Sequence, residues 1–175
     1  MKMSNLSFKM MVNLGMPIRN LFIPPAKMIS EIGITKGQKV LDYGCGPGKF
    51  SIMIAEIIGP SGIVYALDVH PLAIQSVKRK AQQRNLANIK TILSDCSTSL
   101  PDNSIDCVVC FDVFHSLNNQ EKVIVELHRV LKSDATMCFS DHHMKETEIL
   151  KRLTEPGLFK LQRKGKRTFT FSKMR

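Results

Sequence analysis

Three glycines stand at alternate positions in Gly44–Gly48, directly after the apolar and acidic stretch Val40–Tyr43. Glycine has no side chain, so a loop of this kind lets a ligand approach the backbone closely. In the dinucleotide fingerprint the last glycine comes three residues after the second, and that position here is Lys49. The carboxylate of Asp42 would also repel a pyrophosphate, whereas it suits a ligand with a cationic end. The stretch therefore predicts a nucleoside site of another kind, with a tight turn that binds nothing as the alternative.

Acidic residues also follow the second and third predicted strands. Asp68 ends the apolar run Ile63–Leu67, about 20 residues past the glycine loop, where an acid can accept hydrogen bonds from both ribose hydroxyls. Asp95 follows Ile89–Leu93 in the same way, although an aspartate at such a place also commonly caps a turn. The glycine loop and the two acids together predict a nucleoside-binding crossover.

These residues resemble the class I S-adenosylmethionine-dependent methyltransferases. The resemblance rests on Asp42–Gly48, on Asp68 and on later segments, and it covers the chain from about Ile32 to the C-terminus. It implies S-adenosylmethionine as the cofactor, with its methionine portion at the glycine loop, its ribose at Asp68 and its adenine amino group at Asp95. The cofactor contacts that follow from the resemblance are Asp42, Gly44, Cys45, Gly46, Gly48, Asp68, Val69, Asp95, Cys96 and Phe111.

Acids and histidines follow the fourth and fifth predicted strands, and the resemblance places substrate-facing residues in the loop after the fourth. Asp112 and His115 come after the run Ile105–Phe111, and His142 comes after Thr136–Ser140. Methyl transfer requires an aligned acceptor and the exclusion of water, and it needs a base only where the acceptor must lose a proton. Asp112, His115 and His142 are the predicted catalytic residues, with a structural role as the alternative for each. The Asn-Pro-Pro-Tyr signature of many amino-methylating members is absent, which argues against an adenine or glutamine amide acceptor.

Cysteine use indicates a reducing compartment and no metal site. The chain has five cysteines, an odd number, and no amino-terminal export signal, which together predict free thiols and a cytoplasmic location. Cys107 and Cys110 have the spacing of metal ligands, but residues three apart on a strand point to opposite faces and cannot hold one ion. His142 and His143 are too few ligands unless Asp141 or another side chain joins them. No metal is therefore predicted.

The elements that must position these residues alternate between strand and helix. This alternation predicts an α/β fold, a Rossmann-like doubly wound sheet of seven strands with a C-terminal antiparallel hairpin. Apolar side chains at 3.6-residue spacing predict helices over 49–58, 71–84 and 119–132. A turn is expected at 133–135, and the hairpin strands at 158–164 and 168–173. Ligands in such sheets bind at the switch point, here between the first and fourth strands.

Methionines are concentrated near the N-terminus. Residues 1–32 hold six of the ten methionines and form a predicted Met-rich helical segment that could fold over a hydrophobic substrate. An ordinary packed helix or a frayed terminus is the alternative. Prolines at 17, 24 and 25 precede a short helix that is predicted from Ala26 to about Ile32. Residues 33–175 are then the S-adenosylmethionine-binding methyltransferase domain.

The net charge and its distribution indicate which kinds of partner the protein could bind. The formal net charge is +10, and residues 145–175 hold ten basic and three acidic side chains. A basic segment suits nucleic acid, although a solvated surface explains it equally well. With two tyrosines and no tryptophan there is little aromatic surface for stacking bases, so only weak RNA binding is predicted. No apolar run approaches the roughly 20 residues of a membrane span.

The sequence therefore predicts an S-adenosylmethionine-dependent methyltransferase that acts on a small molecule, and thiol, metalloid and quinone-type acceptors all fit. RNA methylation is the alternative among enzymes, because of the basic hairpin. A non-catalytic cofactor-binding or regulatory subunit is the alternative of another class, because the chain is short and has no obvious catalytic signature.

Overall fold

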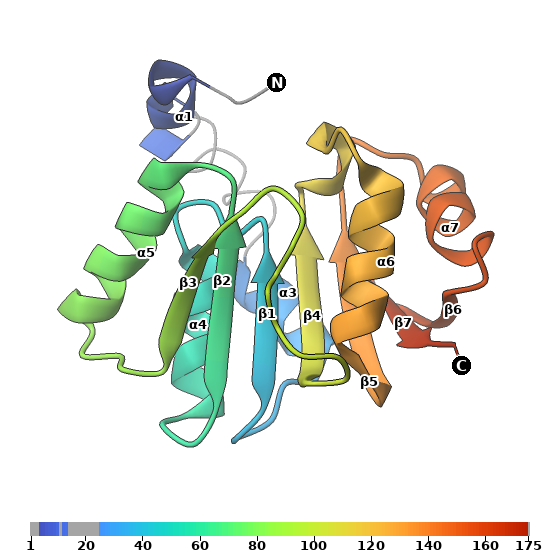
Figure 1. Cartoon of the computed structure of the whole chain (residues 1–175), viewed down its shortest axis with the longest axis horizontal. Helices are drawn as coiled ribbons and strands as arrows, with labels where there is room; N and C mark the ends of the chain where they lie inside the picture. Colours follow the sequence, from blue (N-terminus) through green and yellow to red (C-terminus); the bar gives the residue numbers. More distant parts are fainter. Residues whose placement is uncertain (1–3, 11, 14–24, 175) are drawn as a thin grey trace.

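Apolar runs between turns form the strands of one sheet. The computed structural model describes residues 4–10, 12–13 and 25–174, and within them seven strands pair in the order β3-β2-β1-β4-β5-β7-β6 (Figure 1). The strands are β1 (Lys39–Tyr43), β2 (Ile63–Asp68), β3 (Ile89–Leu93), β4 (Ile105–Phe111), β5 (Leu131–Ser140), β6 (Phe159–Lys164) and β7 (Phe169–Lys173). Strands β1 to β5 are parallel, whereas β7 is antiparallel to both β5 and β6. The predicted Rossmann-like sheet with its C-terminal hairpin is confirmed.

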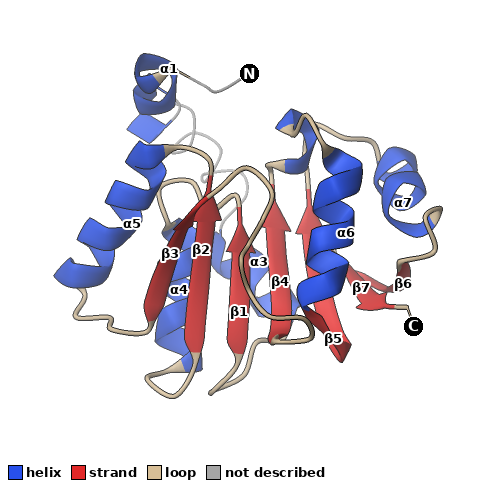
Figure 2. Cartoon of the chain, viewed as in Figure 1, coloured by secondary structure: helices blue, strands red, loops and turns tan. Residues whose placement is uncertain are grey.

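Helices cover both faces of this sheet (Figure 2). The helices are α1 (Asn5–Met10), α3 (Pro25–Ile32), α4 (Lys49–Ile58), α5 (Pro71–Gln83), α6 (Gln120–Val130) and α7 (Glu146–Thr154), with a 3-10 turn η2 (Phe114–Ser116). One face buries Ile29 of α3, Ile54 of α4 and Val77 of α5, while the other buries Leu127 of α6 and Leu153 of α7. Among the described helices, none combines the length and the apolar character that crossing a membrane requires.

The winding of the chain reverses between β1 and β4, as predicted. From β1 the chain proceeds outward through β2 to β3, and it then returns across the sheet to β4, which pairs with the other side of β1. The loops that follow β1 and β4 therefore lead away from each other. A crevice forms between such loops, outside the carboxyl ends of the strands.

The return from β3 to β4 is made by residues 94–104, which contain no helix or strand. Parallel strands are usually joined by a helix that covers the sheet. Here the connection runs across the front of the sheet as an open loop (Figure 1). Cys96 and Leu100 are half-buried against the core beneath it. Contacts other than helical hydrogen bonds must hold this loop in place.

The fifth strand begins earlier than the sequence predicts. Helix α6 ends at Val130 and β5 starts at Leu131, so the turn expected at 133–135 is wrong. Leu131 and Ala135 are both buried in the core, which keeps this stretch on the sheet. A shift in the pairing of β4 with β5, between Ile105 and Cys107, absorbs the extra residues.

Helix α7 is absent from the sequence prediction, which treats residues 145–157 only as part of a basic segment. Its signal is nevertheless present. Ile149 and Leu153, four residues apart, are its buried side chains, and acidic residues in its first turn and basic residues in its last complement the helix dipole.

The methionines of the N-terminal segment have different surroundings. Met10 is exposed on α1, whereas Met28 is buried between α3 and the sheet. Helix α3 confirms the short helix predicted before β1. The remaining methionines of the segment, Met1, Met3, Met11 and Met16, and the breaks predicted at Pro17 and Pro24, lie outside the described residues.

Candidate functional site

The glycine loop joins β1 to α4 and adopts backbone angles that favour glycine. The φ angle is +75° at Gly44, +52° at Gly46 and +85° at Gly48. A Cβ atom at Gly44 would lie 2.5 Å from a methyl carbon of Val113, and one at Gly48 would lie 2.6 Å from a methyl carbon of Val77. At Gly46 no atom of the described residues lies within 4 Å of that position. The loop is therefore closed by packing at its two ends and open at its centre.

Asp68 faces the open centre of the loop from the end of β2. Its Oδ2 accepts a hydrogen bond from the Gly46 backbone N–H at 2.8 Å, and its Oδ1 accepts one from the His70 backbone N–H, also at 2.8 Å. Burial raises the pKa of this carboxyl above its ordinary value, while the two N–H donors act in the opposite direction. The carboxylate is thus held in one orientation, and each oxygen keeps a lone pair for a hydroxyl group of a ligand.

A cleft opens at the carboxyl ends of β1, β2 and β3. Its lining includes four of the predicted cofactor residues, Gly44, Asp68, Val69 and Asp95. The opposite wall is the segment after β4, with Val113 and residues 116–119. The cleft therefore joins the glycine loop to the loop that carries the predicted catalytic residues.

Asp42 lies behind this cleft. Its side chain is buried and accepts a hydrogen bond from the Ser51 hydroxyl at 2.5 Å. Burial is the main reason that the pKa of Asp42 rises from 3.8 to about 7, against the lowering effect of Ser51. The structure thus places this carboxyl against Ser51 of α4, and its contact with a cationic ligand stays a prediction.

Three further predicted cofactor residues pack into the protein. Cys45 is buried with the apolar face of α5, Phe111 meets the ring of Phe50 edge-on with centroids 5.0 Å apart, and Cys96 is half-buried against the core. Burial raises the pKa of Cys45, so its thiol is neutral. Direct contacts of these residues with a cofactor stay predictions.

Tyr43 connects the first strand to the loop after the third. Its hydroxyl donates a hydrogen bond to the backbone carbonyl of Asp95 at 3.0 Å, and the residue is 1% exposed. Burial raises the pKa of Tyr43, so the hydroxyl keeps its proton and remains a donor. No separate role is predicted for Tyr43 from the sequence, although its place at the end of the first strand is the signal that could have indicated one.

Two histidine–aspartate pairs cross between the carboxyl ends of β4 and β5. His115, which follows β4, has its Nδ1 2.9 Å from both carboxylate oxygens of Asp141, which follows β5. His142, which follows β5, has its Nδ1 2.7 Å from Oδ1 of Asp112, which follows β4. The backbone N–H groups of the two histidines donate to the same two carboxylates. The structure therefore brings the three predicted catalytic residues together and adds Asp141 to them.

His143 lies beside both pairs. Its ring centroid is 4.2 Å from that of His115 and 3.8 Å from that of His142. Burial, and then the neighbouring imidazoles, lower the pKa of His143 below 6.5. His143 and Asp141 are not among the catalytic residues predicted from the sequence. The missed signal is that an aspartate and a histidine follow each of two strands whose ends share one edge of the sheet.

Metal coordination has no support in the part of the chain that the structure describes, where no three His, Cys, Asp or Glu side chains are arranged to hold an ion. Cys107 packs with the face of the sheet under α3 and α4, and Cys110 packs with the face under α6. The predicted separation of these two thiols is confirmed. All five cysteines are free.

Comparison with known proteins identifies the kind of domain that carries this cleft. A family model described as a methyltransferase domain matches residues 34–170 of the 175-residue chain. The chain belongs to this family. The resemblance of its glycine loop and strand-tip acids to the class I S-adenosylmethionine-dependent methyltransferases is thereby confirmed.

Curated relatives of this methyltransferase domain share its sequence over part of their length. A demethylmenaquinone methyltransferase of Geobacillus sp. (strain WCH70) is 34% identical over 105 residues, which are 59% of this chain and 45% of the relative. The protein of the same name from Geobacillus stearothermophilus is 33% identical over 113 residues, 63% of this chain and 48% of the relative. The chain spans about half the length of the curated relatives it matches.

A solved structure matches the domain from end to end. It is a SAM-dependent methyltransferase from Aquifex aeolicus, with a TM-score of 0.82, 25% sequence identity, and 99% of each chain covered. The whole described fold, including the hairpin of β6 and β7, therefore has a counterpart among methyltransferases.

Proposed function

We propose that this methyltransferase domain transfers the methyl group of S-adenosylmethionine to a small molecule. The observation that carries the proposal is the cleft, because its lining joins Gly44 and Asp68 to the segment after β4, and that segment also carries His115. Cofactor binding and acceptor chemistry would thus meet at one edge of the sheet.

The residues present fit the cofactor. Space without a side chain lies over Gly46, and the Asp68 carboxylate faces it with free lone pairs, as a ribose diol requires. Asp95 lines the far end of the cleft, where an adenine amino group would find an acceptor. When bound, S-adenosylmethionine supplies an electrophilic methyl group on a sulfonium, with a neutral thioether as leaving group.

We assign the removal of a proton from an acceptor to His115. Its Nδ1 lies against Asp141, whose side chain is fully buried, so Nδ1 carries the proton and donates to the carboxylate. Nε2 then has the lone pair that takes a proton from the acceptor, and the buried carboxylate stabilises the imidazolium that results. The crossed pair of His142 with Asp112 holds the neighbouring loop and offers a second base.

A quinol-type ring is the acceptor class that we favour. Such an acceptor has an acidic hydroxyl, which gives the base at His115 a proton to remove. Support for it also comes from the name of the curated relatives, demethylmenaquinone methyltransferase.

Two basic side chains of the hairpin already have partners within the protein, which supports a small-molecule acceptor over RNA. Arg163 donates to the backbone carbonyl of Glu31, and Lys164 pairs with Glu146 at 2.5 Å. The Arg167 backbone N–H and the Thr168 hydroxyl bind the Glu31 carboxylate. These contacts tie the hairpin to α3 and α7.

Incubation of the protein with methyl-labelled S-adenosylmethionine and a demethylated naphthoquinol tests the proposal. A parallel incubation replaces the quinol with a cell extract that is divided into small-molecule, RNA and protein fractions. We expect label in the quinol or in another small molecule. His115→Gln should reduce the rate at least about 100-fold, the usual effect of losing a general base, without weakening S-adenosylhomocysteine binding. His128→Gln is the matched control, because His128 contacts the Met174 carbonyl away from the cleft. Label in RNA alone, or in no fraction, would contradict the proposal.

A further inference from the structure

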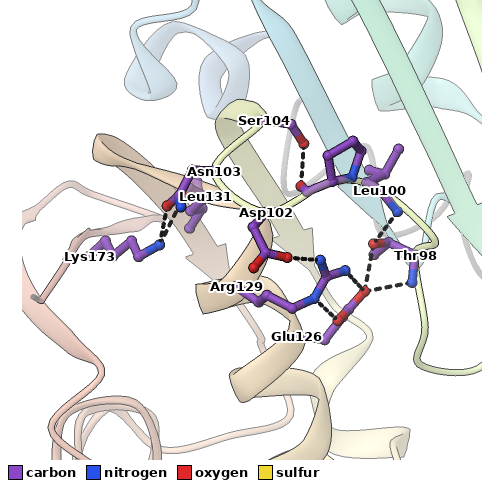
Figure 3. A network of polar contacts seen from close by, with 10 residues as sticks. Thr98, Leu100, Asp102, Asn103, Ser104, Glu126, Arg129, Leu131 and Lys173 are labelled. Carbon is purple, nitrogen blue, oxygen red and sulfur yellow. Dashed lines mark hydrogen bonds and ion pairs between the residues drawn. The ribbon is translucent and has the colours of Figure 1, made fainter.

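One carboxylate holds the open connection between β3 and β4. Oε1 of Glu126, on α6, accepts hydrogen bonds from the Thr98 backbone N–H at 2.8 Å and from the Thr98 hydroxyl at 2.6 Å (Figure 3). Thr98 is 1% exposed, and its own Oγ1 accepts from the Leu100 backbone N–H at 3.2 Å. The middle of the loop is therefore fixed by a partly buried polar contact to a helix.

Arg129 fixes that carboxylate in turn. Its Nε lies 2.8 Å from Oε2 of Glu126, one terminal nitrogen lies 2.8 Å from Oε1, and the other contacts Asp102 near the end of the loop (Figure 3). Hydrogen bonds from Arg129 and Thr98 hold the pKa of Glu126 at about 2, against the effect of burial. We call Thr98, Glu126 and Arg129 the clamp, and its carboxylate on Glu126 is thus ionised at neutral pH.

The clamp stands between two other anchors of the same loop. At the cleft end, the Tyr43 hydroxyl binds the carbonyl of Asp95 at 3.0 Å. At the far end, the backbone N–H groups of residues 103 and 104 donate to carbonyls at the end of α6. Thr98 is three residues beyond Asp95 in the chain, so the clamp restrains the loop close to the residues that line the cleft.

We propose that Thr98, Glu126 and Arg129 are positioning residues for the nucleobase end of the cofactor site. None of them lines the cleft, and they act by holding Ser94 and Asp95 at the depth where a purine amino group meets an acceptor. This inference rests on the proposed function, since it takes adenine as the group beside Asp95. Contacts outside the cleft would then contribute to the affinity for the cofactor and to the selectivity for its nucleobase. The histidines that remove a proton from the acceptor have no part in this role.

Calorimetric titration with two ligands tests the clamp. S-adenosylhomocysteine carries the purine amino group, and S-inosylhomocysteine has an oxo group in its place. We expect Thr98→Val and Glu126→Gln to weaken binding of the adenine ligand about tenfold, the scale of one lost hydrogen bond, and to change binding of the inosine ligand much less. Hydrogen exchange of residues 94–100 should become faster in both variants. Glu146→Gln, which removes the ion pair with Lys164, is the matched control and should change neither measurement.

The outcomes separate the clamp from the proposed function. If the unmutated protein binds neither ligand, the proposed function is wrong. If it binds the adenine ligand and both variants keep the same ratio of affinities, the clamp has no positioning role, even where loop exchange is faster. A general loss of stability would lower the melting temperature and leave that ratio unchanged, so the ratio distinguishes positioning from folding.

Discussion

The phenyl ring of Phe8 stacks on the imidazole of His70, with ring centroids 4.3 Å apart and planes inclined by 12°. Each of these residues is 6% exposed, and the His70 backbone N–H is one of the two donors to Asp68. Helix α1 therefore packs against His70, which helps to orient Asp68, the residue predicted to bind the ribose. The helix lies far from both residues in the sequence.

Phe8→Ala should detach α1 and weaken S-adenosylhomocysteine binding. An aromatic contact contributes about 0.5–1.5 kcal/mol beyond its buried area, which corresponds to a loss of roughly twofold to twelvefold in affinity. Calorimetry measures the affinity, and hydrogen exchange of residues 5–10 reports the helix. Leu6→Ala is the control on the same helix, because Leu6 is 70% exposed. Equal affinities for the two variants would show that α1 does not support the site.

Gly46→Ala should abolish cofactor binding while the domain stays folded, because the new methyl group would occupy the open centre of the loop. Gly157→Ala is a matched control, since Gly157 also has positive φ, +73°, and open space around its Cβ position. Both variants should lose about 1–2 kcal/mol of stability from the left-handed backbone. Thermal melting measures the stability of the two variants, and calorimetry measures their affinity for the cofactor. Undiminished binding by Gly46→Ala would show that the centre of the loop does not contact the cofactor.

Asp68→Ala should weaken S-adenosylmethionine binding by roughly 1.5–3 kcal/mol, the scale of hydrogen bonds to a charged group. Part of this loss arises because the Gly46 and His70 N–H groups lose their acceptor. The exposed acid Asp134, changed to Ala, controls for the loss of a negative charge. A similar small change in both variants, measured by calorimetry, would contradict the role of Asp68.

Asp42→Asn should alter how stability depends on pH. The pKa of Asp42 is about 7 in the folded protein and 3.8 ordinarily, so between these values the folded state binds one more proton than the unfolded state. The free energy of unfolding therefore falls as pH rises through this window, and it stays lowered above about pH 7. Asn does not ionise, so the variant should gain melting temperature over the unmutated protein at about pH 8 and not at about pH 4. The same difference in melting temperature at both pH values would show that burial does not raise the pKa of Asp42.

Local patterns in the sequence predict much of this fold. The helix over 49–58 has the predicted bounds, and α5 begins at Pro71, because apolar spacing, a glycine stop and a proline at the first helical position all act within a few residues. The open glycine loop and the acids after β2 and β3 are predictable for the same reason.

Relationships between distant residues are not predictable in this way. The pairing of His115 with Asp141 depends on the register between β4 and β5, and that register contains an irregularity that no local pattern announces. The contact of Glu126 with Thr98 joins a helix to a loop without regular structure. Helix α7 shows a different cause, since its short apolar stripe is obscured by the surrounding basic residues.

Strand β7 follows β6 in the chain but lies inside it, between β5 and β6. During synthesis on the ribosome, β6 therefore emerges before the strand that attaches it to the sheet, and the outer edge of β5 waits for the same partner. At ~5–20 residues per second, the stretch from Ser140 to Phe169 takes roughly 1.5–6 s to make. An unpaired strand edge is a template for other chains throughout that interval. The nascent domain thus keeps an unpaired edge on β5 after the predicted cofactor-binding loops have been made and until β7 is added.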